Sequence, residues 1–255
     1  MRSRYVDVDD ASEDFRELLA DEPEIAKDFL VRYELSWLYH DCALEGVVLS
    51  NQELAMALAR QPVAEATSVN LFREVQNHKA AIDLVRAEAA GKKLRINLTL
   101  VKKIYETLGA GIESKAVAEY RKEIPLHRAY FHEIAQPAKI AFQLGKVLDA
   151  CDSSDFRALH PVQQAARIGH GFMQVYPFTE NSGKVARMLS NLVLLHSGYL
   201  PCVIHATDRQ RYYESLRGAE TVLRELMLDS LGNALANGEK YVREAMAHRA
   251  KKAAR

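Results

Sequence analysis

The amino-acid sequence predicts an all-α protein, and two observations carry that prediction. Apolar residues recur three and four positions apart along most of the chain, which is the spacing of an amphipathic helix. No segment before Gly111 alternates apolar and polar residues as a half-buried strand does. Of the 255 residues, 48% are apolar, which allows a large core, and the length suits one large domain or a domain with an appendage.

The first helices are expected on either side of Pro23. Residues 12–32 carry an apolar face within an acidic segment, and Pro23 divides it because proline has no backbone N–H to donate. Residues 35–47 are predicted to form the next helix. It should end at Gly46, since glycine readily takes the left-handed conformation that closes a helix.

Further helices are expected along the rest of the chain, with one irregular stretch. Helical spacing covers residues 51–90 with a break near Pro62, and a new helix is predicted with Thr99 as its N-cap. The pattern loosens over residues 112–134, where a short hairpin is expected at 119–128. The remaining helices are predicted over residues 135–150, 161–172, 183–195, 208–216 and 223–247, before a basic tail.

Composition excludes several kinds of function. The 34 basic and 34 acidic side chains balance, so net charge does not direct the protein to nucleic acid. Cys42, Cys151 and Cys202 are too far apart for a metal site and are interpreted as reduced structural residues. No apolar run approaches membrane-spanning length, and the charged N-terminus lacks the apolar part of a signal peptide. A cytoplasmic protein without membrane or nucleic-acid partners is therefore expected.

The best candidate for a functional site is the polar turn at residues 180–183, between two predicted helices. A helix that starts near Gly183 points free N–H groups and the positive end of its dipole into the turn, which favours an anion. Lys184 and Arg187 add positive charge within one helical turn, and Glu180 can hold a divalent metal beside a phosphate. The pattern indicates a magnesium-assisted phosphate or nucleotide site. The alternative is an ordinary polar helix cap.

The segment Tyr176–Arg187 resembles the motif of the Fic family, His-Pro-Phe-x-(Asp/Glu)-Gly-Asn-Gly-Arg-x-x-Arg, with the spacing kept throughout. The resemblance extends over about residues 35–235 and implies an all-α Fic fold with, at most, a small β-hairpin flap. Residues 1–34 would then form an N-terminal helical lead, and residues 236–255 a C-terminal helix with the basic tail.

Members of this family typically transfer AMP from ATP to a hydroxyl of a target protein. In that reaction the motif His takes the proton of the hydroxyl, the acid holds magnesium, the turn and first Arg hold the diphosphate, and the last Arg meets the γ-phosphate. The resemblance therefore implies Mg and ATP or another nucleotide as cofactors. By position it assigns the metal to Glu180, the catalytic place to Tyr176, and phosphate binding to Asn181, Ser182, Gly183, Lys184 and Arg187.

Four positions of the motif depart from the family pattern. Tyr176 replaces the His, and a phenol with a pKa of about 10 is protonated at neutral pH and is a poor general base. Asn181 and Ser182 stand where Gly and Asn are usual, which changes the anion-binding turn. Lys184 replaces an Arg, and lysine cannot form the bidentate hydrogen bonds with which arginine binds phosphate. Together these changes argue against ordinary AMP transfer.

A second segment, residues 41–46, resembles the inhibitory helix of the family, whose pattern is (Ser/Thr)-x-x-x-Glu-(Gly/Asn). Asp41 stands where Ser or Thr is usual, and Glu45 and Gly46 match. In the family this Glu pairs with the last motif Arg, so that ATP cannot bind productively. The resemblance implies the same inhibitory role for Glu45 through a pair with Arg187. Considered without the resemblance, Glu45 is an exposed glutamate at the end of a helix.

A flap is expected over residues 119–134, because in the family this region aligns the main chain of the target beside the site as an added strand. Residues 119–121, Glu-Tyr-Arg, partly match the usual lead into it. Arg121, His127 and Arg128 could contact a substrate, although solvent is the expected surrounding of each. A protein target or partner is therefore expected at the flap. The architecture is also compatible with a homodimer through the leading helices.

Three functional hypotheses remain open. The first is a degenerate Fic protein, impaired or inactive in AMP transfer, that still binds a nucleotide or a protein partner in the motif groove. The second is an active transferase that uses Glu180-bound Mg to move a phosphate-containing group, with Tyr176 as acid, acceptor or modified residue. The third is a structural or partner-binding scaffold without nucleotide. The first is favoured because of Tyr176, although His160 or His170, for which structural roles are expected, could replace the missing base.

Overall fold

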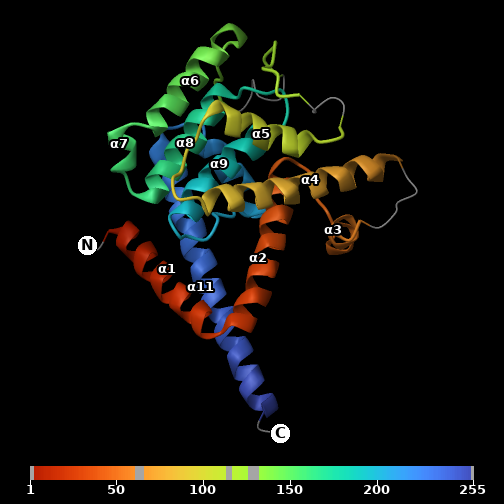
Figure 1. Ribbon diagram of the computed structural model, residues 1–255, viewed down its shortest axis with the longest axis vertical. Helices are drawn as coiled ribbons and strands as arrows, with labels where there is room; N and C mark the ends of the chain where they lie inside the picture. Colours follow the sequence, from red (N-terminus) through yellow and green to blue (C-terminus); the bar gives the residue numbers. More distant parts are fainter. Residues whose placement is uncertain (1–2, 61–65, 113–116, 126–131, 254–255) are drawn as a thin grey trace.

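The computed structural model describes residues 3–60, 66–112, 117–125 and 132–253 (Figure 1). The prediction of an all-α protein is confirmed, since the described residues contain helices and no β-strand. The helices, with two short 3₁₀ segments, are α1 (Arg4–Asp21), α2 (Pro23–Leu44), α3 (Asn51–Leu58), α4 (Ala66–Ala89), α5 (Leu98–Gly109), η3 (Pro137–Lys139), α6 (Ile140–Cys151), α7 (Ser154–Arg157), α8 (Pro161–Val175), α9 (Ser182–His196), η4 (Ala206–Asp208), α10 (Arg209–Ser215) and α11 (Glu220–Ala253).

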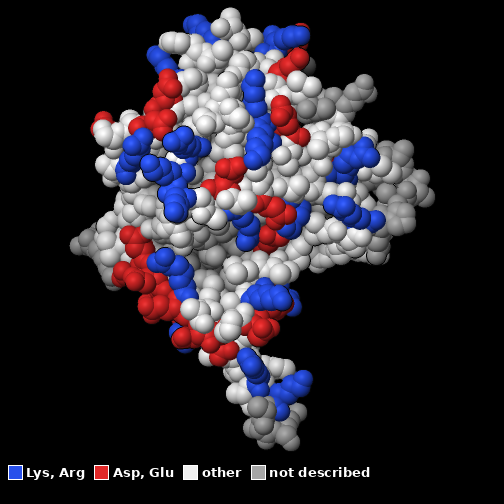
Figure 2. Space-filling model, viewed as in Figure 1, with Lys and Arg blue, Asp and Glu red and all other residues white. Residues whose placement is uncertain are grey.

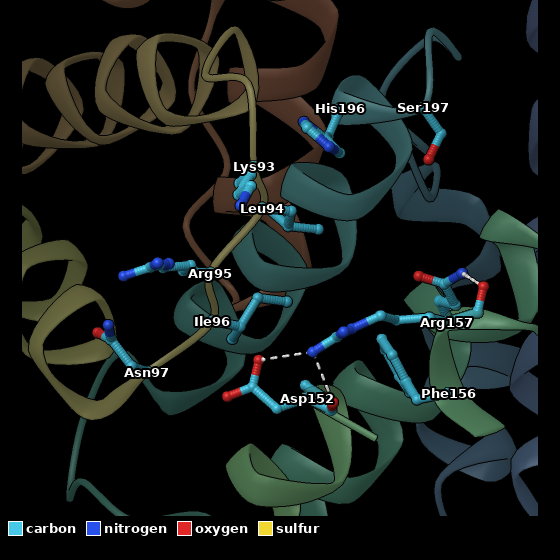
Figure 3. A pocket seen from close by; sticks show the side chains of 12 residues that line it. Lys93, Leu94, Arg95, Ile96, Asn97, Asp152, Phe156, Arg157, His196 and Ser197 are labelled. Atoms are coloured by element: carbon cyan, nitrogen blue, oxygen red, sulfur yellow. Dashed lines mark hydrogen bonds and ion pairs between the residues drawn. The ribbon is translucent and has the colours of Figure 1, made fainter. Parts of the chain in front are cut away.

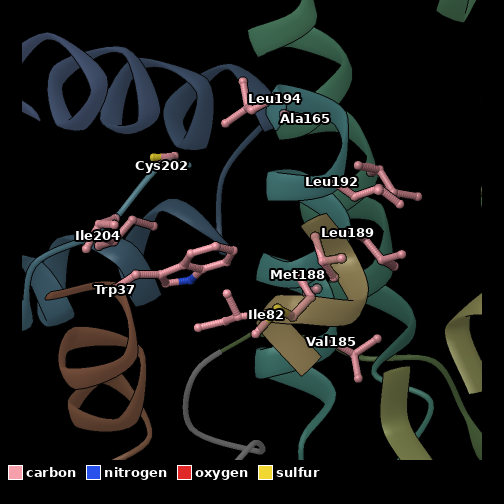
Figure 4. Close-up of a cluster of buried hydrophobic side chains, with 14 of the residues drawn as sticks. Trp37, Ile82, Ala165, Val185, Met188, Leu189, Leu192, Leu194, Cys202 and Ile204 are labelled. Carbon is pink, nitrogen blue, oxygen red and sulfur yellow. The ribbon is translucent and has the colours of Figure 1, made fainter. Parts of the chain in front are cut away.

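Helix α9 lies at the centre of the fold and packs against α8, α4 and α5. Residues 182–194 of α9 are all buried. Figure 4 shows Met188 of α9 near Ile82 of α4, with Trp37 of α2 beside them, and all three belong to the hydrophobic core. Each large apolar side chain buried in this way contributes about 1.5–3 kcal/mol. The core therefore fixes the helix whose first turn carries the predicted motif.

Helices α1 and α2 form a V that packs on α11 (Figure 1). Pro23 stands at the first position of α2, where its missing N–H would have no partner in any case. The contact with α11 is close at Gly238, because a Cβ there would come within 2.7 Å of Phe15 and 3.0 Å of Phe29. Acidic side chains line the outer face of α1 (Figure 2). Beyond the V, α2 continues into the core, where Trp37 is fully buried.

The predicted break at Pro23 is confirmed, but the helices around it are longer than expected. Helix α1 already begins at Arg4, because Val8 packs into the core and extends the apolar face toward the N-terminus. Helix α2 runs from Pro23 to Leu44 without interruption. Gly46 follows with a φ of +89°, the left-handed conformation predicted for the end of this helix.

Two local predictions need correction or fall outside the description. Thr99 does not cap α5: Asn97 does, since its side-chain oxygen accepts the N–H of Leu100 at 2.9 Å. Asparagine is a stronger N-cap than threonine, which accounts for the shift. Of the expected hairpin, residues 119–125 form no strand, and residues 126–131 lie outside the described residues.

The long helices cross the expected limits of the three regions. The limit after residue 34 falls inside α2, and the limit after residue 235 falls inside α11. The division into a lead, a domain and a tail stays a prediction. Within the described ranges, the structure contains no helix with the length and apolar character needed to cross a membrane.

Candidate functional site

The predicted motif forms a tight loop between α8 and α9. Tyr176 and Asn181 have left-handed backbone conformations, with φ of +46° and +58°, and they turn the chain at the two ends of the loop. Ser182 closes it, because its hydroxyl donates to the carbonyl of Phe178 and accepts the N–H of the same residue, each at 2.9 Å. Ser182 is fully buried. The structure therefore uses this predicted phosphate ligand to hold the loop.

Tyr176, at the catalytic place of the motif, is turned into the protein. It follows α8 as its C-cap, with its N–H donated to the carbonyl of Phe172 at 2.8 Å. Only 2% of the residue is exposed, and it belongs to the hydrophobic core. A hydroxyl on another protein reaches this phenol only after the loop has rearranged.

Arg121 holds the same loop from the other side, and the expectation that solvent surrounds it is wrong. Only 3% of Arg121 is exposed. Its guanidinium donates to the carbonyl of Tyr176 at 2.7 Å, to that of Val175 at 3.2 Å, and to those of Glu123 and Ala135. Burial lowers the pKa of this guanidinium. The carbonyls at the negative end of α8 accept the hydrogen bonds of the cation. Because every residue has a main-chain carbonyl, the sequence does not indicate which ones will bind an arginine. His127 and Arg128 lie outside the described residues.

Arg187 is the electrostatic centre of the site. Its Nε donates to Oδ1 of Asp41, and its Nη2 donates to Oε1 of Glu45 at 2.8 Å. The guanidinium also lies 5.6 Å from the centre of the Tyr212 ring. Arg187 is 7% exposed. Burial alone would lower its pKa, but the charges of Asp41 and Glu45 raise that pKa well above its usual value.

Asp41 is held on both of its carboxylate oxygens. Oδ1 accepts from Arg187, and Oδ2 lies 2.7 Å from Nε2 of His78 on α4. The other ring nitrogen of His78 lies 3.5 Å from Sγ of Cys42. Burial favours the neutral acid, yet Arg187 and His78 outweigh it and lower the pKa of Asp41 to about 2. Asp41 is therefore ionised at neutral pH.

The carboxylate of Glu45 covers the N-terminus of α9. A Cβ on Gly183 would collide with Oε1 of Glu45 and would lie 3.1 Å from Nη1 of Arg187, so a larger residue here would displace the Glu45 carboxylate. Nη1 of Arg187 is buried and has no hydrogen-bond partner in the described part of the chain. Glu45 thus occupies a place where a helix N-terminus and an arginine together favour an anion.

Lys184 and Glu180 have different surroundings. Lys184 is buried, and its charge, after that of His78, helps to lower the pKa of Cys42 against the effect of burial. Glu180 is exposed and lines a cavity of about 730 Å³ together with residues 119–125. The described residues contain no group of three side chains able to hold a metal ion. A metal ion at Glu180 would therefore need the phosphates of a ligand as its further partners.

The two histidines considered as replacement bases are bonded elsewhere. Nδ1 of His160 accepts the N–H of Val162 at 3.2 Å, which caps α8, and its Nε2 lies 2.9 Å from Asp9. Nε2 of His170 lies 3.0 Å from the carbonyl of Gly218. These partners match the structural roles expected for both rings.

A second cavity, of about 860 Å³, lies at the opposite end of α9, beside His196 (Figure 3). Lys93, Arg95 and Arg157 bring positive charge to it, and all three are exposed. Arg157 donates to the carbonyl of Asp152 at 2.6 Å and lies 3.5 Å from its carboxylate. No residue of the predicted motif lines this cavity. The candidate site is therefore the start of α9, where the charges are buried and paired.

Comparison with known proteins agrees with this geometry. Residues 95–194 match the model of the Fic/DOC family. They form a Fic/DOC family domain. The chain is 23% identical, over 184 residues, to "Protein adenylyltransferase Fic" of Aedes aegypti. That match covers 71% of this chain and 36% of the relative, so the chain spans about a third of the length of such curated relatives.

Solved structures show the same fold. A Fic domain containing signaling protein from Bacteroides thetaiotaomicron matches with a TM-score of 0.79 and 19% identity, over 95% of this chain and 97% of that one. A structure of IbpAFic2 covalently tethered to Cdc42 matches with a TM-score of 0.50 and 20% identity, over 71% and 61% of the two chains. The prediction of a Fic fold is confirmed.

The resemblance to the family paired Glu45 with Arg187 and assigned Gly183 to phosphate binding. It recorded Asp41 only as a departure from the pattern and did not single out His78. The one signal available was that both are polar residues on helix faces that are otherwise apolar. Such residues are buried only with partners. Asp41 pairs with Arg187 and His78, and His78 also contacts Cys42.

Proposed function

We propose that this chain is a degenerate Fic protein, impaired in AMP transfer, that binds the phosphates of a nucleotide at the start of α9 in a site closed by Glu45. One observation carries the proposal. Glu45 places a carboxylate over Gly183 and pairs it with Arg187 at 2.8 Å. A carboxylate held by an arginine at a helix N-terminus occupies the place that suits a phosphate.

Impaired transfer follows from the chemistry and placement of Tyr176. A phenol with a pKa of about 10 is a weak general base at neutral pH. The residue is also buried in the core, where an acceptor hydroxyl does not reach it. Of the two possible substitutes, His160 is held through both ring nitrogens, and Nε2 of His170 is held at the carbonyl of Gly218.

The residues present fit a phosphate-containing ligand with magnesium. Gly183 leaves space that a Cβ would fill, and Nη1 of Arg187 is a buried donor with no partner among the described residues. Once Glu45 has moved away, both would be free to bind phosphate oxygens. Glu180 would hold Mg²⁺ together with those oxygens, and the ion would neutralise phosphate charge. The proposed role of this chain is to bind and orient the phosphates.

A protein segment is proposed as the partner at the cavity beside Glu180. The cavity lies between the motif loop and residues 119–125, and polar and apolar side chains line it together. A neighbour in fold, IbpAFic2, is tethered to Cdc42 in its solved structure, which is consistent with a protein partner here. Tyr120 and Ile124 supply apolar area in the cavity for such a contact.

Calorimetry tests the proposed binding. ATP, ADP, GTP and CTP are titrated with Mg²⁺ into the wild type, Glu45→Gly and Glu45→Gly/Arg187→Lys. Glu45→Gly is expected to bind at least one nucleotide about tenfold more tightly than the wild type, since an internal anion has been removed. Arg187→Lys keeps the charge but loses the bidentate hydrogen bonds of arginine, so it should weaken that binding. Absence of binding in all three proteins would overturn the proposal.

AMP transfer is tested separately by mass spectrometry of the protein and of candidate targets. Glu45→Gly is expected to show no transfer, because the general base is still missing. Transfer by Glu45→Gly with Tyr176 intact would contradict the impairment and favour an active transferase with altered chemistry. Tyr176→His in the same background shows whether only the base is missing.

A further inference from the structure

Arg187 pairs with two acids, and the two are held very differently. Glu45 is the C-cap residue of α2, is followed by Gly46, and its side chain is 20% exposed. Asp41 lies one turn earlier, inside the helix, with 3% of its side chain exposed. Glu45 therefore has room to turn toward solvent, whereas Asp41 has none.

Asp41 is also fixed by its partners. Arg187 holds Oδ1 through Nε, and His78 lies at Oδ2, so a rotation of the carboxylate breaks both contacts at once. The main-chain carbonyl of Asp41 lies 3.4 Å from Nη2 of Arg187 and adds a further acceptor on the same side. His78 is itself fully buried and lies against Cys42. Nothing in this arrangement releases Asp41 when Glu45 moves.

We propose that Asp41 is a permanent second anion of this site, which keeps Arg187 neutralised after Glu45 has turned away and so selects against highly charged phosphate ligands. The proposal rests on the proposed function and adds the rule that decides which ligands bind. With Glu45 withdrawn, Arg187 and Asp41 carry no net charge between them. A phosphate at Gly183 then meets the unpartnered Nη1 of Arg187, but also the field of a buried carboxylate behind it.

Repulsion by Asp41 grows with the charge of the ligand, because the Coulomb energy is proportional to that charge. Replacing Asp41 by asparagine removes the charge and keeps both the shape and an oxygen that accepts from Arg187 Nε. The gain in affinity should therefore be largest for a triphosphate, smaller for a monophosphate and absent for adenosine. A purely structural role for Asp41 predicts no such order.

The experiment compares Glu45→Gly with Glu45→Gly/Asp41→Asn by calorimetry, using ATP, AMP, adenosine and inorganic triphosphate as probes, with and without Mg²⁺. The expected gain from Asp41→Asn is about tenfold or more for ATP and for triphosphate without Mg²⁺, about threefold for AMP, and none for adenosine. Mg²⁺, which neutralises part of the phosphate charge, should reduce the gain. Asp229→Asn, which removes a carboxylate paired with Arg4 and Arg211 far along the chain, is the matched control.

The outcomes separate the two proposals. If a protein that binds nucleotide shows equal affinities with and without Asp41→Asn, only the proposed role of Asp41 is overturned, and the proposed nucleotide binding stands. Weaker binding on Asp41→Asn also overturns it and makes Asp41 an anchor for Arg187. If Asp41→Asn raises the affinity for inorganic triphosphate and ATP binds no more tightly than triphosphate, the role of Asp41 is supported. The proposal of a nucleotide site is then overturned. No binding of any probe to either protein overturns both. Glu45→Gly/Asp41→Ser, with the shorter side chain, checks each result if the asparagine variant is unstable.

Discussion

Arg121 and Arg187 are two buried arginines on either side of the motif loop, and they are neutralised in opposite ways. Within the described residues, Arg121 donates to four main-chain carbonyls and to no carboxylate. Arg187 donates to the side chains of Asp41 and Glu45. Main-chain carbonyls cannot leave without unfolding the loop, whereas the carboxylate of Glu45 has room to turn away. Burial of a cation therefore marks a structural clamp in the first case and, in the function proposed above, a ligand site in the second.

The largest effect is expected for Arg121→Met. Several buried carbonyls lose their donor, each at about 1–3 kcal/mol, so a loss of about 4 kcal/mol in the free energy of unfolding is expected. Urea denaturation measures it, with the exposed neighbour Lys122→Met as a control that should change little. A loss below about 1 kcal/mol would mean that water replaces the guanidinium, and the contrast with Arg187 would disappear.

A somewhat smaller loss is expected for Arg187→Met. The change leaves Asp41 buried without its cation, which costs about 3 kcal/mol, the lower end for a broken buried pair because His78 remains. In an Asp41→Asn background the cost should fall to about 1 kcal/mol, since no charge is left behind. A double-mutant cycle by urea denaturation measures this coupling, and the same cycle between Asp41 and Arg121 should give none. Equal coupling in both cycles would refute the distinction.

Acid should weaken the contacts of Asp41 with Arg187 and His78, because Asp41 becomes protonated. It should leave the hydrogen bonds from Arg121 to main-chain carbonyls intact. The pKa of Asp41 is about 2 in the folded protein, against about 4 in the unfolded chain. Because the pKa of Asp41 is lower in the folded protein than in the unfolded chain, the ionised carboxylate stabilises the fold at any pH above about 4. This contribution of about 2 kcal/mol is lost as the pH falls from about 4 through 2. The stability difference between the wild type and Asp41→Asn should therefore shrink over that range. A difference that is constant with pH would show that Asp41 carries no buried charge.

The smallest effect is expected for Gly183→Ala. The new Cβ meets the Glu45 carboxylate, which can turn away, so a loss of about 1 kcal/mol is expected. Glu45→Ala in the same chain should remove that loss. Gly145→Ala on α6, where a Cβ meets nothing within 4 Å, serves as the control and should stabilise the helix. Thermal unfolding of Gly183→Ala, Glu45→Ala, their double variant and Gly145→Ala measures the effect. A loss of stability that persists without Glu45 would place the clash elsewhere.

The helices could be predicted from the sequence because helical spacing and helix ends are local properties. Pro23 and Gly46 act through their own backbone, and both mark helix ends in the structure. The N-cap of α5 was misplaced by a competition between two good candidates, Asn97 and Thr99. Arg121 was predicted to lie in solvent, and its carbonyl partners have no side-chain signature in the sequence that could have indicated its burial.

The candidate site could be predicted only in part. Glu45 and Arg187 were paired by resemblance to a family, although they stand far apart in the chain. No spacing rule connects His78 with Asp41, because two helices must pack before the contact exists. Whether Asp41 is charged depends on its burial and on its contacts with Arg187 and His78, and neither can be derived from sequence.

The packing of α2 limits how the site can open. Trp37 and Leu38 hold this helix in the core, so releasing it as a whole would dismantle the centre of the protein. The helix ends at Leu44, and the side chain of Glu45, which follows it, is 20% exposed. The opening proposed above therefore needs only a rotation of this one side chain. A ligand that binds at α9 in the proposed way would compete with the Glu45 carboxylate, and its association would not wait for a helix to leave.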